Sequence, residues 1–306
     1  MGTQRVFPLV SRGRRLVGVP FGEQRSARRG RGSDVAGSRP YEPGDPVATI
    51  DWYGTARLSA AYGRDEFLVH TRFADEAPRV VIVCDQRPAM ALFQPLFPWL
   101  SKPEATATAV RMIGASAVAA RAEAGYLDLA AARPFWVPPG TRGHERLVRR
   151  RRGEAPFDAP PDNVARALDF LLRRQRDLPP GAFVFVISDF LVPFPAALWV
   201  RALGARWDPV PVIVQDPTWE QSFPDIGGVV APIADPADGR VRDVRLSASE
   251  ARREKSANEQ RLRGLVARFS RLGLDPVLLG TSDELEVLRR FLAWAQRRRL
   301  ARRVQR

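Results

Sequence analysis

Cysteine and histidine are almost absent from this chain of 306 residues. The single cysteine, Cys84, excludes an intrachain disulfide and fits a reducing compartment. Because Cys84 ends an apolar run, it is expected to be a small buried hydrophobic side chain rather than a nucleophile. His70 and His144 are far apart in the sequence and lack a metal-ligating partner three or four residues away, which excludes an ordinary zinc motif.

Long apolar runs are absent as well. No stretch approaches the about 20 apolar residues of a membrane-spanning helix, and residues 1–18 lack the apolar region of a signal peptide. We therefore expect a soluble, cytoplasmic protein. The sequence also lacks a Walker-type phosphate loop and a nucleophile elbow around Ser188, so neither an ATPase nor a serine hydrolase is expected.

Basic residues are in excess, and the excess lies at the two ends. The formal net charge is +14, with only Lys102 and Lys255 as lysines among 48 basic residues. Residues 1–40 carry nine arginines against two acids, and residues 289–306 carry eight arginines and no acid. Such ends attract nucleic acid, an anionic membrane surface or an acidic protein, or they are simply solvated. The sequence leaves these alternatives open.

Short β-branched runs alternate with amphipathic stretches from residue 78 onward. Strands are expected at 78–85, 126–132, 135–139, 182–190, 209–216 and 274–282. Helices are expected at 101–125, 141–152, 162–176, 195–206, around 262–269 and at 283–303. This alternation predicts an α/β fold with a doubly wound, mostly parallel sheet of the Rossmann type.

One domain with small additions is the simplest organisation. We expect residues 1–66 to form an extended basic segment whose turn-rich block packs on the core, and residues 67–306 to form the α/β domain. Two extended runs flank Asp238 and Gly239, a pair typical of hairpin turns, so a β-hairpin insertion is expected at about 227–247.

The block RPYEPGDPVATIDWYGTAR, residues 39–57, is rich in turn-forming residues. Pro43 and Gly44 suit the centre of a type II turn, because proline presets φ and glycine tolerates a positive φ. The carboxylate of Asp45 can cap that turn.

The second half of the block predicts a short strand. The letters ATIDW would then place Asp51 and Trp52 on opposite faces. Pairing of Arg39 or Arg57 with Asp45 or Asp51 would fix the block against the sheet. Such a block either locks a loop to the core or forms a rigid surface on which a partner docks.

These segments resemble a bacterial family called domain of unknown function 58. The resemblance spans roughly residues 13–300 and rests on residues 22–34, 39–58, 79–90 and 186–190. The specific part is the 39–57 block, where the family pattern is matched by Arg39, Tyr41, Gly44, Asp45, Asp51, Trp52 and Arg57, with Pro43 as the turn residue before Gly44.

The resemblance implies a von Willebrand factor A-like domain that associates with MoxR-type AAA+ ATPases. It implies a part in assembling or activating other proteins and no enzymatic activity. In intact von Willebrand A domains, an Asp-x-Ser-x-Ser loop and a second aspartate surround a divalent cation, usually magnesium.

By this resemblance the metal site is degenerate here. Asp85 holds the first position and Asp189 the distal one, but Arg87 and Ala89 stand where the two serines belong. We expect the guanidinium of Arg87 to neutralise both aspartates in place of magnesium, so that the protein holds no metal cofactor. The alternative is that Arg87 is an exposed loop residue.

The leading prediction is a non-enzymatic scaffold or adaptor that works with a MoxR-type ATPase and an unidentified client protein. One alternative is a nucleic-acid-binding protein that uses its basic ends, although these ends lack interleaved aromatic residues. Another is a metal-dependent hydrolase that uses Asp85 and Asp189, although both serine ligands are missing.

Overall fold

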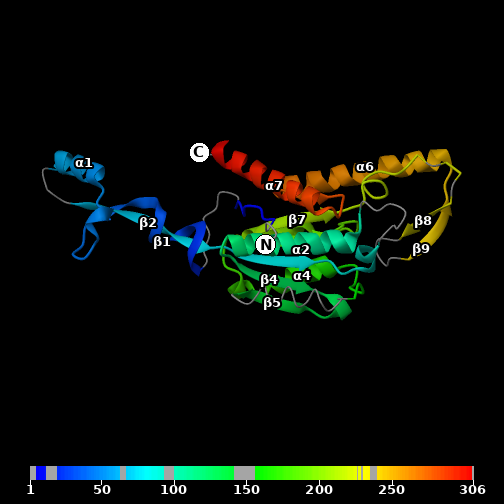
Figure 1. Cartoon of the computed structure of the whole chain (residues 1–306), viewed down its shortest axis with the longest axis horizontal. Coiled ribbons are helices and arrows are strands. Elements are labelled where there is room, and N and C mark those ends of the chain that lie inside the picture. The colour runs from blue at the N-terminus through cyan, green and yellow to red at the C-terminus, as the bar shows by residue number, and fades with distance from the viewer. Residues whose placement is uncertain are drawn as a thin grey trace.

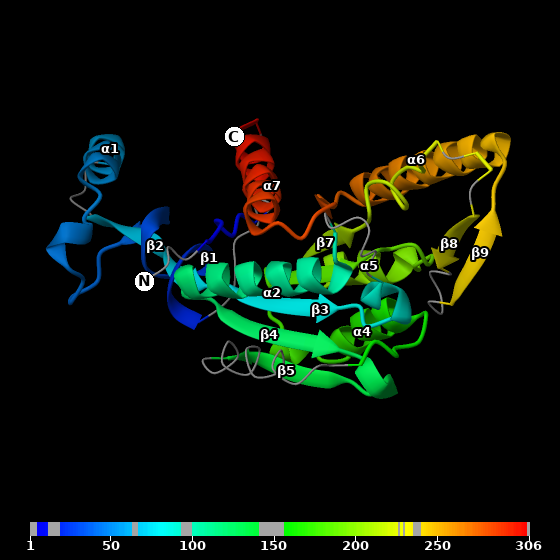
Figure 2. The same cartoon turned by 45° about the vertical axis from the view of Figure 1, so that its right-hand side comes forward.

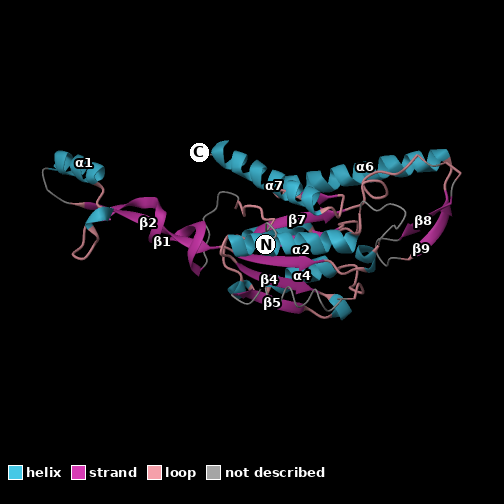
Figure 3. Cartoon of the chain, in the orientation of Figure 1, coloured by secondary structure: helices cyan, strands magenta, loops and turns pink. Residues whose placement is uncertain are grey.

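The computed structural model describes residues 5–11, 19–62, 67–92, 100–140, 156–225, 227–228, 230–234 and 240–304. A six-stranded sheet with helices on both faces forms the main body. A two-stranded arm extends from one end of this body, and a long helix with a hairpin extends from the other (Figure 1). Figure 3 shows how strands and helices alternate through the body. The expected helix at 141–152 lies outside the described residues.

The central sheet is mixed but mostly parallel, as the sequence predicted. Its strands lie in the order β10 (Val277–Leu279), β7 (Asp208–Val214), β6 (Phe183–Ser188), β3 (Arg79–Cys84), β4 (Glu123–Asp128) and β5 (Phe135–Gly140). Every neighbouring pair is parallel except β4 and β5, which are antiparallel. Because β3 pairs with β4 on one side and β6 on the other, the order of the chain reverses between β3 and β6.

The β-branched runs form these strands because the sheet is covered on both faces. All six residues of β6 and all seven of β7 are buried, which explains continuous apolar runs in place of alternation. The strands expected at 78–85, 182–190 and 209–216 are confirmed as β3, β6 and β7. The strand expected at 126–132 instead covers 123–128 and is followed by a short 3-10 helix, η3 (Ala130–Ala132).

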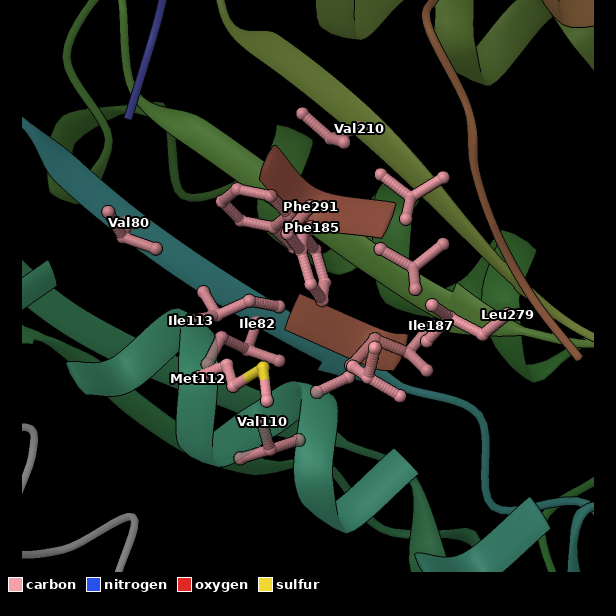
Figure 4. Packing of buried hydrophobic residues seen from close by; sticks show 14 of the residues in the cluster. Val80, Ile82, Val110, Met112, Ile113, Phe185, Ile187, Val210, Leu279 and Phe291 are labelled. Carbon is pink, nitrogen blue, oxygen red and sulfur yellow. The ribbon is translucent and has the colours of Figure 1, made fainter. Parts of the chain in front are cut away.

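Two helices and the segment 5–11 cover one face of the sheet. These helices are α2 (Lys102–Ala119) and α7 (Glu284–Val304). The ring of Phe7 stacks on Phe291 with centroids 4.4 Å apart and meets Phe185 edge-on. Figure 4 shows Phe185 and Phe291 among the aliphatic side chains of this core.

Three helices cover the opposite face. They are α4 (Asn163–Leu172), α5 (Ala196–Gly204) and the C-terminal part of α6 (Ala248–Arg271). Trp199, Phe194 and Phe269 form an aromatic cluster there, with the last two stacked 4.9 Å apart. A full capping box of Ser247 and Glu250 begins α6, as its sequence pattern indicates.

The arm corrects the expected place of the 39–57 block. Strands β1 (Val19–Pro40) and β2 (Leu68–Ala77) pair antiparallel with several register shifts, and the block lies at their far end. Figures 1 and 2 both place this end well away from the sheet, so the block does not pack on the core as expected.

The short strand expected for ATIDW is also wrong. Residues Val47–Thr49 form a 3-10 helix, η1, and Trp52–Tyr62 form a helix, α1. Ile50 makes only one isolated bridge, to Val69 of β2. The run after Trp52 contains alanine, arginine and leucine, which favour a helix once Asp51 caps its first turn.

Strands β8 (Val230–Ala234) and β9 (Val241–Arg245) form an antiparallel pair where the hairpin was expected. Its turn, with Asp238 and Gly239, lies outside the described residues. A small cluster of Phe223, Leu246 and Ala251 joins this region to α6. Among the helices in the described ranges, none is long and apolar enough to span a membrane.

Candidate functional site

Asp85 and Asp189 follow the two central strands and lie at the same edge of the sheet. Cys84 of β3 is in register with Ile187 of β6, and the amide of Asp85 donates to the carbonyl of Ile187 at 2.9 Å. The carboxyl ends of parallel strands are where open α/β sheets carry their ligand sites, at the point where strand order reverses. The two aspartates occupy that point.

Arg87 lies between the two carboxylates. Its Nη2 and Nε are 2.6 and 2.9 Å from Oδ2 of Asp85, and Nη2 also contacts Oδ1 of Asp189. The arginine side chain is only 2% exposed, so the alternative of an exposed loop residue is wrong. The pairing expected for Arg87 is therefore observed, in a buried site where charge-assisted hydrogen bonds are strong.

Other donors occupy the remaining sites on Asp85. The backbone amide of Arg87 donates to Oδ1 at 2.9 Å, Asn163 Nδ2 donates to Oδ1 at 2.8 Å, and Ser188 Oγ donates to Oδ2 at 2.6 Å. Ala89 is buried in the 3-10 helix η2 (Pro88–Ala91), and its side chain offers no oxygen. The carboxylate is thus fully engaged by hydrogen-bond donors of the chain.

A second cation, which the sequence analysis missed, lies at Asp189. Lys102 Nζ is 3.2 Å from Oδ2 of Asp189 and also contacts Oε1 of Glu220. Lys102 begins α2 and is buried, although a cation is unfavourable at a helix N-terminus. The sequence held one signal for this residue: lysine is rare in the chain, and Lys102 is one of two lysines against 46 arginines.

The local field changes the pKa of each ionic partner. Burial alone would lower the pKa of Arg87, but the charges of Asp189 and Asp85 raise it. The pKa of Lys102 is likewise raised by Glu220 and Asp189 against the effect of burial. Burial would raise the pKa of Asp189, but Lys102 and Arg87 lower it. The pKa of Glu220 is raised, mainly by burial.

A tight turn connects the cluster to α6. Glu220 Oε2 accepts from the amide of Asp216 at 2.8 Å, and Gln215 Nε2 donates to the carbonyl of Asp189 at 2.5 Å. From α6, Asn258 Nδ2 donates to the carbonyls of Trp219 and Ser222 at 3.1 and 2.6 Å. The ionic cluster therefore joins α2 to the ends of the two central strands and, through the turn at 216–222, to the middle of α6.

The residues present do not fit a divalent cation. Magnesium needs free oxygen ligands in near-octahedral geometry, whereas the facing oxygens of Asp85 and Asp189 are bound to the Arg87 guanidinium. Within the described parts of the chain, no group of three histidine, cysteine, aspartate or glutamate residues is arranged to hold a metal ion.

The turn at the tip of the arm has the predicted geometry. Gly44 has a φ of +107°, and the amide of Asp45 donates to the carbonyl of Glu42 at 3.0 Å, as in a type II turn. Oδ2 of Asp45 accepts from the amide of Glu42 at 2.9 Å, and Oδ1 pairs with Arg39 Nη2 at 2.6 Å. Of the alternative pairings, the structure has Arg39 with Asp45.

Asp51 caps α1 instead of alternating with Trp52 along a strand. Its side chain accepts from the amide of Gly54 at 2.8 Å and from Ser38 Oγ at 2.7 Å. Arg57 lies over the ring of Tyr53, with 5.7 Å from Cζ to the centroid. Neither residue fixes the block to the sheet.

Large hydrophobic side chains are exposed around this tip. Trp52 is 62% exposed and Tyr53 75% exposed. The other exposed members of this group, which we call the tip surface, are Tyr41, Val47 and Phe67. Trp52 and Phe67 meet edge-on with centroids 6.1 Å apart, so the surface is in part packed on itself.

The chain is similar to mycobacterial proteins and, at lower identity, to solved structures. Over 233 residues it is 29% identical to Uncharacterized protein Rv1480 of Mycobacterium tuberculosis and to Uncharacterized protein Mb1516 of Mycobacterium bovis, covering 75% of this chain and 68% of each relative.

Two solved structures are 14% identical, each over 72% of this chain and 99% of the other: conserved hypothetical protein BatB from Bacteroides thetaiotaomicron, with a TM-score of 0.38, and an aerotolerance-related membrane protein from Bacteroides fragilis, with a TM-score of 0.44. The family model described as Protein of unknown function DUF58 matches residues 37–263, and the chain belongs to this family.

Proposed function

We propose that this protein is a non-enzymatic scaffold or adaptor and that the tip surface docks a protein partner. The observation that carries the proposal is a hydrogen-bonded tip with exposed aromatic side chains, held away from the body on a two-stranded arm (Figure 2). Tryptophan and tyrosine dominate the binding energy of many protein interfaces.

Rigidity of the tip favours this role. Ion pairing of Arg39 with Asp45 and capping of α1 by Asp51 order the tip before any partner arrives. A surface ordered in advance loses less conformational entropy on binding, so more of its contact energy appears as affinity. No residue of the tip surface belongs to the hydrophobic clusters that the structure shows on the two faces of the sheet.

The family resemblance suggests a MoxR-type AAA+ ATPase as the partner. In this proposal the tip surface binds the ATPase, and the von Willebrand A-like body presents a client protein for assembly or activation. The single buried cysteine, Cys84, fits a reducing compartment, and we propose the cytoplasm as the location.

The ionic cluster supports a structural role for the site that Asp85 and Asp189 form at the edge of the sheet. Arg87 and Lys102 together supply two positive charges to carboxylates at the sheet edge. We infer that they replace a divalent cation, so that no metal-activated water forms there. The proposal therefore includes neither a hydrolase activity nor a metal cofactor.

Co-purification tests the docking role. Tagged wild-type protein should retain a candidate MoxR-type ATPase, and the double variant Trp52→Ala/Tyr53→Ala should lose at least about tenfold of that retention. The matched control is Val118→Ala/Val200→Ala, because both valines are about half exposed on the body. Equal capture by wild type and the tip variant would contradict the proposal.

A further inference from the structure

One face of α7 is fixed to the body by aromatic packing and by a buried arginine. Phe291 and Trp294 are buried beneath the helix. Arg298 donates to both oxygens of Asp208 at 2.7 and 2.9 Å, and its Nε is 3.1 Å from Oδ2 of Asp275. These contacts set the rotation of the helix about its axis, so its opposite face is held toward solvent.

The opposite face carries leucines. Leu285, Leu292 and Leu300 are 44%, 41% and 53% exposed. Their spacings of seven and eight residues correspond to about two helical turns each, which places them on one stripe. Arg289 and Arg299 fall on the same stripe and are exposed.

Positive charge grows toward the C-terminal end of the helix. Glu286 accepts ion pairs from Arg289 and Arg290 at 3.3 and 3.1 Å, so charge in the first turns is partly balanced. No acidic residue follows it in the sequence, while Arg297, Arg298, Arg299 and three further arginines do. In Figure 2 the C-terminal turns of α7 project from the body, where a flat surface can reach them.

We propose that this leucine and arginine stripe binds an anionic phospholipid surface. Helices that lie in a membrane interface carry aliphatic side chains beside arginines, because the leucines enter the acyl boundary while the guanidinium groups meet lipid phosphates. The site is separate from the tip surface and goes beyond the docking role proposed above. It would bring the adaptor to a membrane surface.

The residue types favour lipid over other polyanions. A nucleic-acid surface gains little from leucines in the middle of a basic stripe, and single strands stack on aromatic side chains, which this stripe lacks. An acidic protein could pair with the arginines. Its binding, and that of duplex DNA, are outcomes of the test.

Vesicle co-sedimentation of the full chain tests the proposal. Wild type should sediment with phosphatidylcholine vesicles containing phosphatidylglycerol, should not sediment with phosphatidylcholine alone, and should be released by salt. Arg289→Gln/Arg299→Gln should weaken binding about 30-fold, and Leu292→Ser/Leu300→Ser about tenfold. The control Val200→Ser, at an exposed valine of α5, should bind like wild type.

Each remaining outcome would overturn the proposal. The protein could fail to bind anionic vesicles at low salt. The leucine variant could bind vesicles as strongly as wild type does. The protein could bind duplex DNA or polyglutamate and not vesicles. If the double leucine variant does not keep the wild-type thermal midpoint, Leu300→Ser alone serves, because Leu300 is the most exposed of the three.

Discussion

Lys102 and Arg87 bind different oxygens of one carboxylate, that of Asp189. Lys102 Nζ lies 3.2 Å from Oδ2, and Arg87 Nη2 contacts Oδ1. One cation begins α2 and the other follows β3. Two single positive charges from two elements therefore meet at Asp189 and join those elements through its carboxylate.

Removing the arginine should destabilise the body strongly. In Arg87→Met, Asp85 would lose its cation and Asp189 one of its two, while both carboxylates are fully buried. Loss of one partner from such a group costs about 3–5 kcal/mol of unfolding free energy. Chemical denaturation measures this, with Arg263→Met as control, since Arg263 is an exposed partner in an ion pair of 3.8 Å on α6. A loss below about 1 kcal/mol, typical of surface pairs, would contradict the structural role of Arg87.

Restoring the serines should create an affinity for magnesium. In Arg87→Ser/Ala89→Ser the guanidinium is gone and hydroxyl groups stand at the two serine positions of the family pattern, which adds oxygen ligands that suit a hard cation. We expect magnesium to raise the thermal midpoint of this variant and not that of wild type. Adding Asp85→Ala should abolish the shift. Micromolar, Asp85-dependent binding of magnesium or manganese by wild type would refute the replacement of the metal by Arg87.

Lys102 should stabilise the fold over a defined range of pH. Its pKa in the folded protein is raised above the ordinary 10.5, through Glu220 and Asp189 acting against burial. The stability it contributes is therefore fully present below about pH 10.5 and is lost as pH rises through the folded-state pKa. Lys102→Met should be less stable than wild type at neutral pH, and the difference in unfolding free energy should shrink above pH 10.5. A difference constant up to pH 12 would contradict this assignment.

Glu220 should show a pH dependence in the acid range. Burial raises its pKa in the folded state above the ordinary 4.5, so its contribution is fully present below that pH and is lost as pH rises through the folded-state pKa. Glu220→Gln lacks this titration. The unfolding free energy of wild type minus that of Glu220→Gln should therefore decrease as pH rises from 4.5 toward neutrality. An increase over this range would mean that the salt bridge to Lys102 outweighs burial.

The sequence predicts the strand ends well and the loop contacts poorly. Asp85 and Asp189 could be placed together because each directly follows an apolar β-branched run, and parallel strands align their carboxyl ends. Lys102 and Glu220 meet across 118 residues through a loop whose path no local pattern encodes. Their contact required the structure.

In the arm, the sequence predicted local contacts correctly but not the position of the block relative to the sheet. The type II turn at Gly44 and the ion pair of Arg39 with Asp45 were both predicted, because each depends on residues close in the sequence. The helix after Asp51 was missed because turn-forming residues dominate the block, while its capping signal is a single aspartate. The distance of the block from the sheet depends on the pairing of β1 with β2, whose register shifts no periodicity predicts.

Loss of the Asp51 cap should loosen the tip and leave the body intact. Asp51 accepts from the first turn of α1 and from Ser38, and these hydrogen bonds, that of Gly54 first, lower its pKa. In Asp51→Ala, amides of α1 should exchange with solvent faster, while those of β3 and β6 keep their protection, because the tip shares no core with the sheet. Exchange measured by mass spectrometry separates the two regions. Faster exchange in β3 as well would mean that the tip is coupled to the sheet through β2, and the docking role would then need a conformational signal along the arm.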